Sequence, residues 1–175
     1  MPDNDRGSGL LIAAVNRELR VISYESPVTS HWDGNAWRSV PFPGSFVANK
    51  LSASPDGTVL AVAADREGSA PRSAFMRWDE AQWVEERIPM PERATPGRVT
   101  VRTSRDIWVT GAAPDQQVTY RPFTIHWGGR RWKEARTPPT TFGHFTDICP
   151  VSSRLTWVLR NDGDHATLLR RTGGD

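Results

Sequence analysis

Apolar and β-branched residues follow one another along this chain in short runs, which end at clusters of glycine, proline, aspartate and asparagine. The run at 59–63 begins after Asp56-Gly57, and the run at 123–127 ends before Gly128-Gly129. Such turn residues supply the positive φ angles of tight hairpins. No segment keeps an apolar period of 3.6 residues over the length of a helix. The pattern therefore predicts many short β-strands and almost no helix.

A pair of tryptophans recurs along the chain. Each pair stands five positions apart around a polar turn, in three segments that align without gaps: His31-Trp32-Asp33-Gly34-Asn35-Ala36-Trp37, Arg77-Trp78-Asp79-Glu80-Ala81-Gln82-Trp83 and His126-Trp127-Gly128-Gly129-Arg130-Arg131-Trp132. Trp32 and Trp78 are 46 residues apart, and Trp78 and Trp127 are 49 apart. Arg170-Arg171-Thr172-Gly173 forms a degenerate fourth copy. The chain is therefore built from an internal repeat.

A second element lies between the tryptophan pairs. Residues 104–111 match residues 153–159, with Trp108 and Trp157 in the same place, and residues 54–62 are a looser copy. Each unit then reads as four short strands: one before this element, one within it, one ending at the first tryptophan and one starting at the second. Residues 10–15 occupy the place of a second strand. We therefore expect 14 strands, without the first strand of the first unit and the last strand of the last.

Four short strands in each repeat of this length are typical of a β-propeller. We predict a single all-β domain over 1–175, a small propeller of about four blades of four antiparallel strands, with units near 10–43, 44–92, 93–141 and 142–175. The alternative is half of a seven- or eight-bladed ring that a homodimer completes. Unpaired edge strands at both ends would otherwise invite pairing with another chain.

The tryptophan motif also points to a known group of proteins. The pattern consists of His31-Trp32-Asp33-Gly34 with its second tryptophan, then proline, and then an element such as Ser104-x-Asp106-x-Trp108. It resembles the Trp-rich, kelch-like propeller repeats of actinobacterial proteins. The resemblance runs from about Leu10 to Gly173. It implies a propeller fold and leaves the function open, because such repeats host binding, scaffolding and some enzymes.

Composition and charge limit the partners and the cellular compartment that we expect for this protein. The formal net charge is +2 and no long basic run occurs, so we expect no nucleic-acid partner. No apolar run is long enough to span a membrane, and residues 1–6 do not resemble a secretory signal. The single cysteine, Cys149, fits a reducing compartment. Arginine greatly outnumbers lysine, as in GC-rich bacterial genomes. We expect a bacterial, cytoplasmic protein.

Side chains that could carry chemistry mostly repeat with the units. His31 and His126 share one repeat position, which favours packing or hydrogen bonding between blades. The aspartates in repeated turns are expected to cap those turns rather than to act as paired acids; they are Asp33, Asp56, Asp79 and Asp106. Cys149 lies in an apolar strand and is expected in the core. We predict no catalytic residues, no metal site and no cofactor.

Residues that break the repeat are better candidates for binding. The first strand of each blade lines the central channel of a propeller, and polar side chains there would suit an anionic or polyhydroxyl ligand. The candidates on these strands are Asn49, Lys50, Arg102, His144 and Asp147.

Three functions remain open. The first is a non-catalytic binding or scaffold module that recognises a protein partner through loops on one propeller face. The second is a lectin-like propeller that stacks aromatic rings on a glycan. The third is a small-molecule enzyme of a bacterial biosynthetic pathway. The lack of a catalytic constellation favours the first, so we lean against an enzyme.

Overall fold

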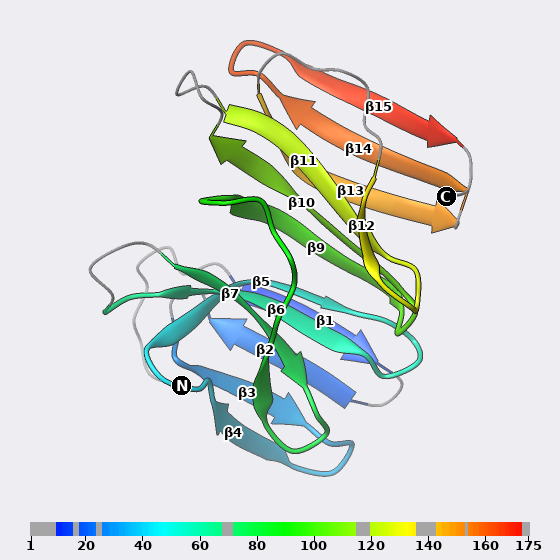
Figure 1. Ribbon diagram of the computed structural model, residues 1–175. Helices are drawn as coiled ribbons and strands as arrows, with labels where there is room; N and C mark the ends of the chain where they lie inside the picture. The colour runs from blue at the N-terminus through cyan, green and yellow to red at the C-terminus, as the bar shows by residue number, and fades with distance from the viewer. Residues whose placement is uncertain are drawn as a thin grey trace. The chain divides into compact units, whose positions relative to one another are not determined.

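The computed structural model describes residues 10–15, 18–23, 26–67, 72–114, 120–135, 143–152 and 154–172. All regular elements in these ranges are β-strands, and they contain no helix (Figure 1). The described chain accordingly has no helix capable of crossing a membrane. The prediction of an all-β chain is confirmed.

The strands form four antiparallel sheets, and in each sheet the spatial order follows the chain order. The first sheet holds β1 (Leu10–Val15), β2 (Glu18–Ser23), β3 (Val28–Trp32) and β4 (Trp37–Pro41). The second holds β5 (Phe46–Ala53), β6 (Val59–Asp65), β7 (Ser73–Trp78) and β8 (Trp83–Glu86). The third holds β9 (Thr95–Thr103), β10 (Asp106–Pro114), β11 (Tyr120–Trp127) and β12 (Trp132–Glu134). The fourth holds β13 (His144–Ser152), β14 (Leu155–Asn161) and β15 (Ala166–Thr172).

Contacts divide the chain into two compact units. The first unit, Met1–Glu86, contains the first two sheets, and the second unit, Arg87–Asp175, contains the other two.

The first sheet corrects one expectation. β1 pairs with β2 from Leu10↔Ser23 to Val15↔Glu18, so residues 10–15 are the first strand of a complete sheet and not a second strand. The described chain thus has 15 strands in place of the expected 14. The Ser-x-Asp turn that marks the second and third sheets, at Ser54 and Ser104, is missing from this copy, and its absence hid the strand pair. Among the described residues, the fourth sheet has three strands, as expected.

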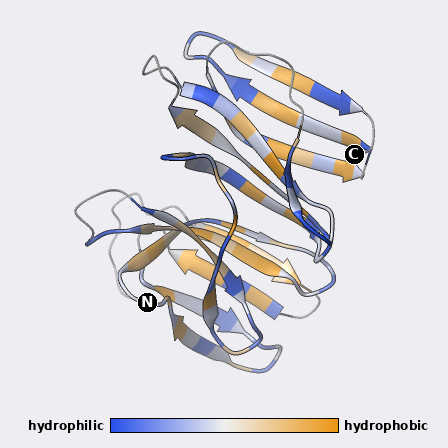
Figure 2. Ribbon diagram, in the orientation of Figure 1, coloured by the Kyte–Doolittle hydropathy of each residue, from blue (hydrophilic) through white to orange (hydrophobic). Residues whose placement is uncertain are grey.

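The core of the first unit is formed between its two sheets. β6 is a nearly continuous hydrophobic strand in Figure 2, and its first five residues are buried. Phe42 stacks on Trp83 with ring centroids 4.9 Å apart. The indole Nε1 of Trp83 donates a 3.0 Å hydrogen bond to Thr29 Oγ1 of the first sheet. Trp83 therefore joins the two sheets through both its ring and its N–H group.

Trp108 is the centre of the core in the second unit. It is fully buried and packs in one cluster with Phe145, Ile148 and Val158 of the fourth sheet. β9 and β13 also approach closely, because a Cβ atom on Gly97 would lie only 2.5 Å from the carbonyl oxygen of Phe145. The two sheets of this unit are therefore packed through both side chains and backbone.

Trp37 and Trp83 hold the same repeat position but differ in burial, with exposed fractions of 53% and 4%. We expect Trp83→Ala to lower the free energy of unfolding by about 3–5 kcal/mol, as for other buried aromatics. Trp37→Ala should change it by at most about 1 kcal/mol, because most of its ring is already in water. Urea unfolding of the two variants measures this. Equal losses would contradict the packing role of Trp83.

Candidate binding site

Asn49 and Lys50, two of the predicted channel residues, lie in β5 of the first unit. The ladder passes from Ala48↔Ala63 to Lys50↔Val62, so Asn49 is the extra residue of a β-bulge. Both side chains are half-buried. Asn49 Oδ1 is buried and has no hydrogen-bond partner among the described residues. The bulge therefore sets Asn49 apart from its neighbours, and its binding role stays a prediction.

Arg102, His144 and Asp147 lie in the second unit, on the contacting strands β9 and β13. Asp147 Oδ1 lies 3.4 Å from Nε of Arg98, a residue that sequence reasoning missed. Arg98 lies in the same strand as Arg102, which is the extra residue of a register shift in β9, and its place in the predicted first strand was the available signal. Arg102 pairs with Asp106, and His144 is exposed at the start of β13. Of these three predicted residues as the structure describes them, Asp147 is the one with an ion pair across β9 and β13, to Arg98, and a ligand role for all three stays a prediction.

Asp106 was expected in a turn but is the first residue of β10, where it is a buried acceptor with an exposed fraction of 5%. Its Oδ1 accepts a 2.6 Å hydrogen bond from Trp108 Nε1 and lies 3.0 Å from Nε2 of His126. Its Oδ2 accepts a 2.5 Å hydrogen bond from Arg102 Nε. The His126 ring stacks on Trp108 at 4.0 Å between centroids. A buried charge needs such partners, so this cluster is structural.

The first unit repeats the arrangement with glutamate. Glu18 Oε2 lies 3.2 Å from His31 Nε2 and accepts a 3.1 Å hydrogen bond from Arg20. His31 meets the Trp78 ring edge-on at 5.3 Å, and the Arg20 guanidinium lies 4.8 Å from the centroid of the same ring. Burial lowers the pKa of Arg20, and Glu18 acts against this shift. The repeated histidines therefore bond and pack. His31 contacts another sheet, through Trp78, whereas the contacts of His126 with Asp106 and Trp108 lie within its own sheet and not between blades as expected.

The other repeated aspartates do cap turns. Asp33 Oδ1 accepts 2.9 Å hydrogen bonds from the backbone N–H groups of Asn35 and Ala36. Asp79 Oδ1 accepts the equivalent bonds from Ala81 and Gln82, at 3.1 and 2.8 Å. These backbone donors hold the pKa of both carboxyl groups below its usual range. Each turn thus favours an ionised carboxylate.

One more residue departs from expectation. Cys149 is exposed and not in the core. The β13 ladder shifts register between Phe145 and Asp147, and this shift places Asp147 and Cys149 on the exposed face. An apolar strand pattern alone does not reveal such a shift.

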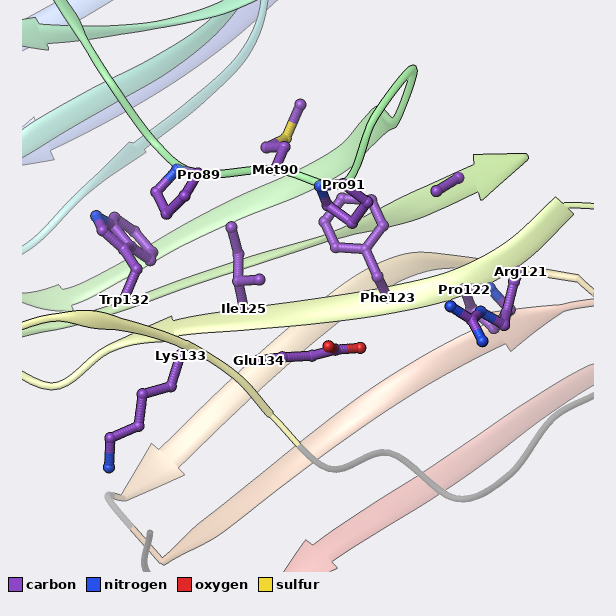
Figure 3. A pocket seen from close by; sticks show the side chains of 11 residues that line it. Pro89, Met90, Pro91, Arg121, Pro122, Phe123, Ile125, Trp132, Lys133 and Glu134 are labelled. Atoms are coloured by element: carbon purple, nitrogen blue, oxygen red, sulfur yellow. The ribbon is translucent and has the colours of Figure 1, made fainter. Parts of the chain in front are cut away.

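A cavity of about 420 Å³ lies beside β11 and β12 of the second unit (Figure 3). The segment 89–91 faces Phe123 and Ile125 of β11 across it, and the Trp132 ring stands beside Pro89. Phe123 and Ile125 are buried, and Trp132 is half-buried. Ala113 and Pro122 also line the cavity, and so do three charged residues, Arg121, Lys133 and Glu134. None of the five predicted channel residues lines this cavity. Sequence reasoning missed it because 89–91 was treated only as a crossing between blades.

The internal repeat explains why space is left here. Met90 stands between two prolines, as Phe42 does in the first unit, and Trp132 holds the repeat position of Trp83. Phe42 stacks on Trp83 and both are buried. A methionine side chain has no flat ring to cover Trp132, which stays half-buried at the cavity wall.

A second hollow, of about 440 Å³, adjoins the first through Lys133. Its other lining residues are Gly128, Arg130 and Arg131 of the turn between β11 and β12. The Arg130, Arg131 and Lys133 side chains are all exposed. The second unit therefore has an apolar cavity with a cationic hollow beside it.

No known protein family and no curated protein matches this sequence. Several solved structures do match its fold. YCF48 bound to D1 peptide superposes with a TM-score of 0.62 and 18% identity over 94% of this chain and 50% of that one. YCF48 from Cyanidioschyzon merolae superposes with a TM-score of 0.57 and 12% identity, over 92% of this chain and 50% of that one. The six-bladed, fucose-recognising lectin of the fungus Aleuria aurantia superposes with a TM-score of 0.56 and 11% identity, over 96% of this chain and 62% of that one.

These identities are low, so the likeness concerns the fold alone. It confirms the predicted β-propeller, with the four sheets as blades. The chain spans about half the length of the two YCF48 structures, as a partial propeller does.

The structural role of the Asp106 cluster can be tested by removing the Asp106 side chain. Asp106→Ala leaves the Trp108 N–H, the His126 ring and the Arg102 guanidinium without their carboxylate. We expect a loss of about 2–4 kcal/mol in the free energy of unfolding, since buried donors would be left unpaired. Asp56→Ala, in a turn at the surface, should cost about 1 kcal/mol or less. If the two losses are equal in urea unfolding, Asp106 is not a structural centre.

The turn aspartates predict a pH effect. Their pKa values are lower in the folded chain than the usual value of about 3.9. They therefore stabilise the fold above that pH, and the contribution is lost as pH falls through the folded-state values. Unfolding of the wild type should become easier in acid more steeply than that of the double variant Asp33→Asn/Asp79→Asn. Parallel acid profiles would refute the caps.

Proposed function

We propose that this protein is a non-catalytic binding module that holds an extended peptide segment of a protein partner in the apolar cavity of the second unit. The observation that carries the proposal is the lining of this cavity. The cavity is lined by the apolar residues Met90, Phe123, Ile125 and Trp132 together with the charged residues Arg121, Lys133 and Glu134. Ligand sites commonly have this composition and a volume of roughly 300–1,000 Å³.

The shape of the lining favours a peptide side chain. Phe123 and Ile125 form a buried floor, and the segment 89–91 forms the facing wall. Proline side chains give a firm apolar wall, and methionine adapts to ligands of varied shape. An apolar or aromatic side chain of a partner would cover Trp132 in the way that Phe42 covers Trp83. The backbone on either side of that side chain would reach the charged border.

The comparisons support a binding role without naming the partner. A YCF48 structure of the same fold contains a D1 peptide. In the described part of this chain, the closest approach to an acid–base pair is Asp106 with His126, and both are buried in the core cluster. This use of the two residues favours binding over catalysis.

A glycan is the second candidate, and Trp132 is the reason to consider it. A half-buried indole next to Lys133 and near Glu134 could stack on a sugar ring while these two groups bond its hydroxyls. The lectin of Aleuria aurantia shows that a propeller of this general fold recognises fucose.

We further propose that the repeats are of the Trp-rich, kelch-like, actinobacterial type and that the protein acts in a bacterial cytoplasm. In this proposal it contacts neither nucleic acid nor membrane, and a second copy is one way to complete the ring. The resemblance in the tryptophan motif and the single cysteine support these points.

Met90→Phe tests the cavity directly. The added ring should fill the space and stack on Trp132, so the melting temperature should hold or rise while peptide binding falls at least about tenfold. Peptides selected from a display library on the wild-type protein are the probes, and their affinity is measured by calorimetry. Met90→Leu, which keeps the volume, is the matched control and should bind normally.

The same variant separates the alternatives. If Met90→Phe binds the selected peptides as the wild type does, the cavity is not the peptide site. If instead a panel of monosaccharides changes the tryptophan fluorescence of the wild type but not of Met90→Phe, and no peptide is selected, the glycan function replaces the peptide function.

A further inference from the structure

Three turns of this chain have the same construction. Each joins the third and fourth strands of its sheet and closes on a direct pair of tryptophans: Trp32↔Trp37, Trp78↔Trp83 and Trp127↔Trp132. The second turn residue has a positive φ in all three, with values of 95° at Gly34, 80° at Glu80 and 86° at Gly129. The three turns therefore share a left-handed second residue, and the first two are also closed by a backbone hydrogen bond, from Asp33 N–H to Ala36 O and from Asp79 N–H to Gln82 O.

The first two turns have an aspartate at the first turn position. Its Oδ1 atom accepts the backbone N–H groups of the residues two and three positions later, which are Asn35 and Ala36 after Asp33, and Ala81 and Gln82 after Asp79. Carboxylates that accept such N–H groups make strong, charge-assisted hydrogen bonds. The turn is thus a two-donor cradle for one carboxylate oxygen.

The third turn has Gly128 where the others have aspartate. The residues two and three positions later are Arg130 and Arg131, and their N–H groups have lost the side chain that would accept them. Space for an acceptor is present, because a Cβ atom on Gly128 would meet only His126 Cε1, at 3.8 Å. Gly128, Arg130 and Arg131 line the cationic hollow together with Lys133. Among the described residues, this turn therefore has no side-chain acceptor of its own, and it lines a positively charged hollow.

The charges around this cradle favour an anion. The side chains of Arg130, Arg131 and Lys133 are exposed and have no ion-pair partner among the described residues. In the two occupied turns, the same backbone donors lower the pKa of the bound carboxyl group. The third turn adds cationic side chains to these donors, so its preference for an ionised group should be stronger.

We propose that the turn from Gly128 to Arg131 binds the carboxylate of an aspartate or glutamate side chain in the partner's peptide segment, in the place that Asp33 and Asp79 fill in their own turns. The proposal rests on the proposed function, since Lys133 lines both this hollow and the apolar cavity. It adds that the peptide is acidic next to its apolar residue.

Acetate is the first probe, and its binding is monitored through the backbone amide NMR signals of Arg130 and Arg131. The ionic strength is held constant, and chloride is the control anion. These two signals should shift in a saturable way in the wild type and in Gly128→Ala. Gly128→Asp supplies an internal carboxylate, so its signals should not respond. A wild type without a saturable shift, or an equal shift in Gly128→Asp, overturns the proposal. So does a larger response to inorganic phosphate than to acetate, which would assign the site to phosphate groups.

A converse variant keeps the test valid if Gly128→Asp does not fold. Asp33→Gly empties the first cradle and frees Arg38, whose guanidinium lies 2.9 Å from the Asp33 carboxylate. Its Asn35 and Ala36 amides should then respond to acetate as Arg130 and Arg131 do. No response in this variant would mean that the turn does not recognise carboxylate.

Peptides distinguish this proposal from the proposed function. Replacing the acidic residue of a selected peptide by its amide should weaken binding to the wild type about tenfold, and binding to Gly128→Asp less than about twofold. Selected peptides with no acidic preference would overturn the carboxylate site and leave the peptide function standing. If the acetate response persists while no peptide binds, the carboxylate site stands and the peptide function is overturned.

Discussion

A carboxylate bonded to a histidine beside a tryptophan ring is the interaction on which each unit depends. Glu18 with His31 and Trp78 forms it in the first unit, and Asp106 with His126 and Trp108 forms it in the second. In both cases the acid opens the second strand of a sheet and the histidine lies near the end of the third, so the pair fixes the register between them. The aromatic ring then extends the contact to the next sheet: Trp78 belongs to the second sheet, and Arg171 of the fourth lies 5.3 Å from the Trp108 centroid. Because the acid is partly or fully buried, its partners are needed to offset desolvation.

This constraint decides where function can be placed. The repeated polar residues are already bonded to one another, so a residue that recurs with the blades is a poor candidate for a ligand contact. The second unit departs from the repeat at two neighbouring places, with Met90 where Phe42 packs and Gly128 where aspartate caps. Each departure removes an internal partner, a ring in one case and a carboxylate in the other. Both hollows of this unit lie at these departures, and they share Lys133.

The tryptophan spacing was enough to predict the sheets, since equivalent strands must return with the repeat. It failed at residues 10–15, where the pairing with 18–23 had no Ser-x-Asp turn to mark it. Asp106 was expected in a turn, but its role depends on His126 and Trp108, which only the folded sheet brings to it. Cys149 was placed in the core because the strand looks apolar, and a register shift turned it outward. The cavity joins Met90 to Trp132, residues far apart in the sequence, so no local pattern could show it.

Gly128 gives the clearest separation between what the fold requires and what it leaves unexplained. A glycine is expected where φ is positive, and Gly129 meets that need, but Gly128 has no positive φ. Nothing lies close enough to its Cα to exclude a side chain either. The aspartates at the same place in the other turns each make two hydrogen bonds that glycine cannot make. The glycine therefore gives up local stability without a return inside the fold, and sites that break a local rule in this way are where function is expected. A carboxylate from outside the chain supplies the missing bonds and accounts for the three cations around them.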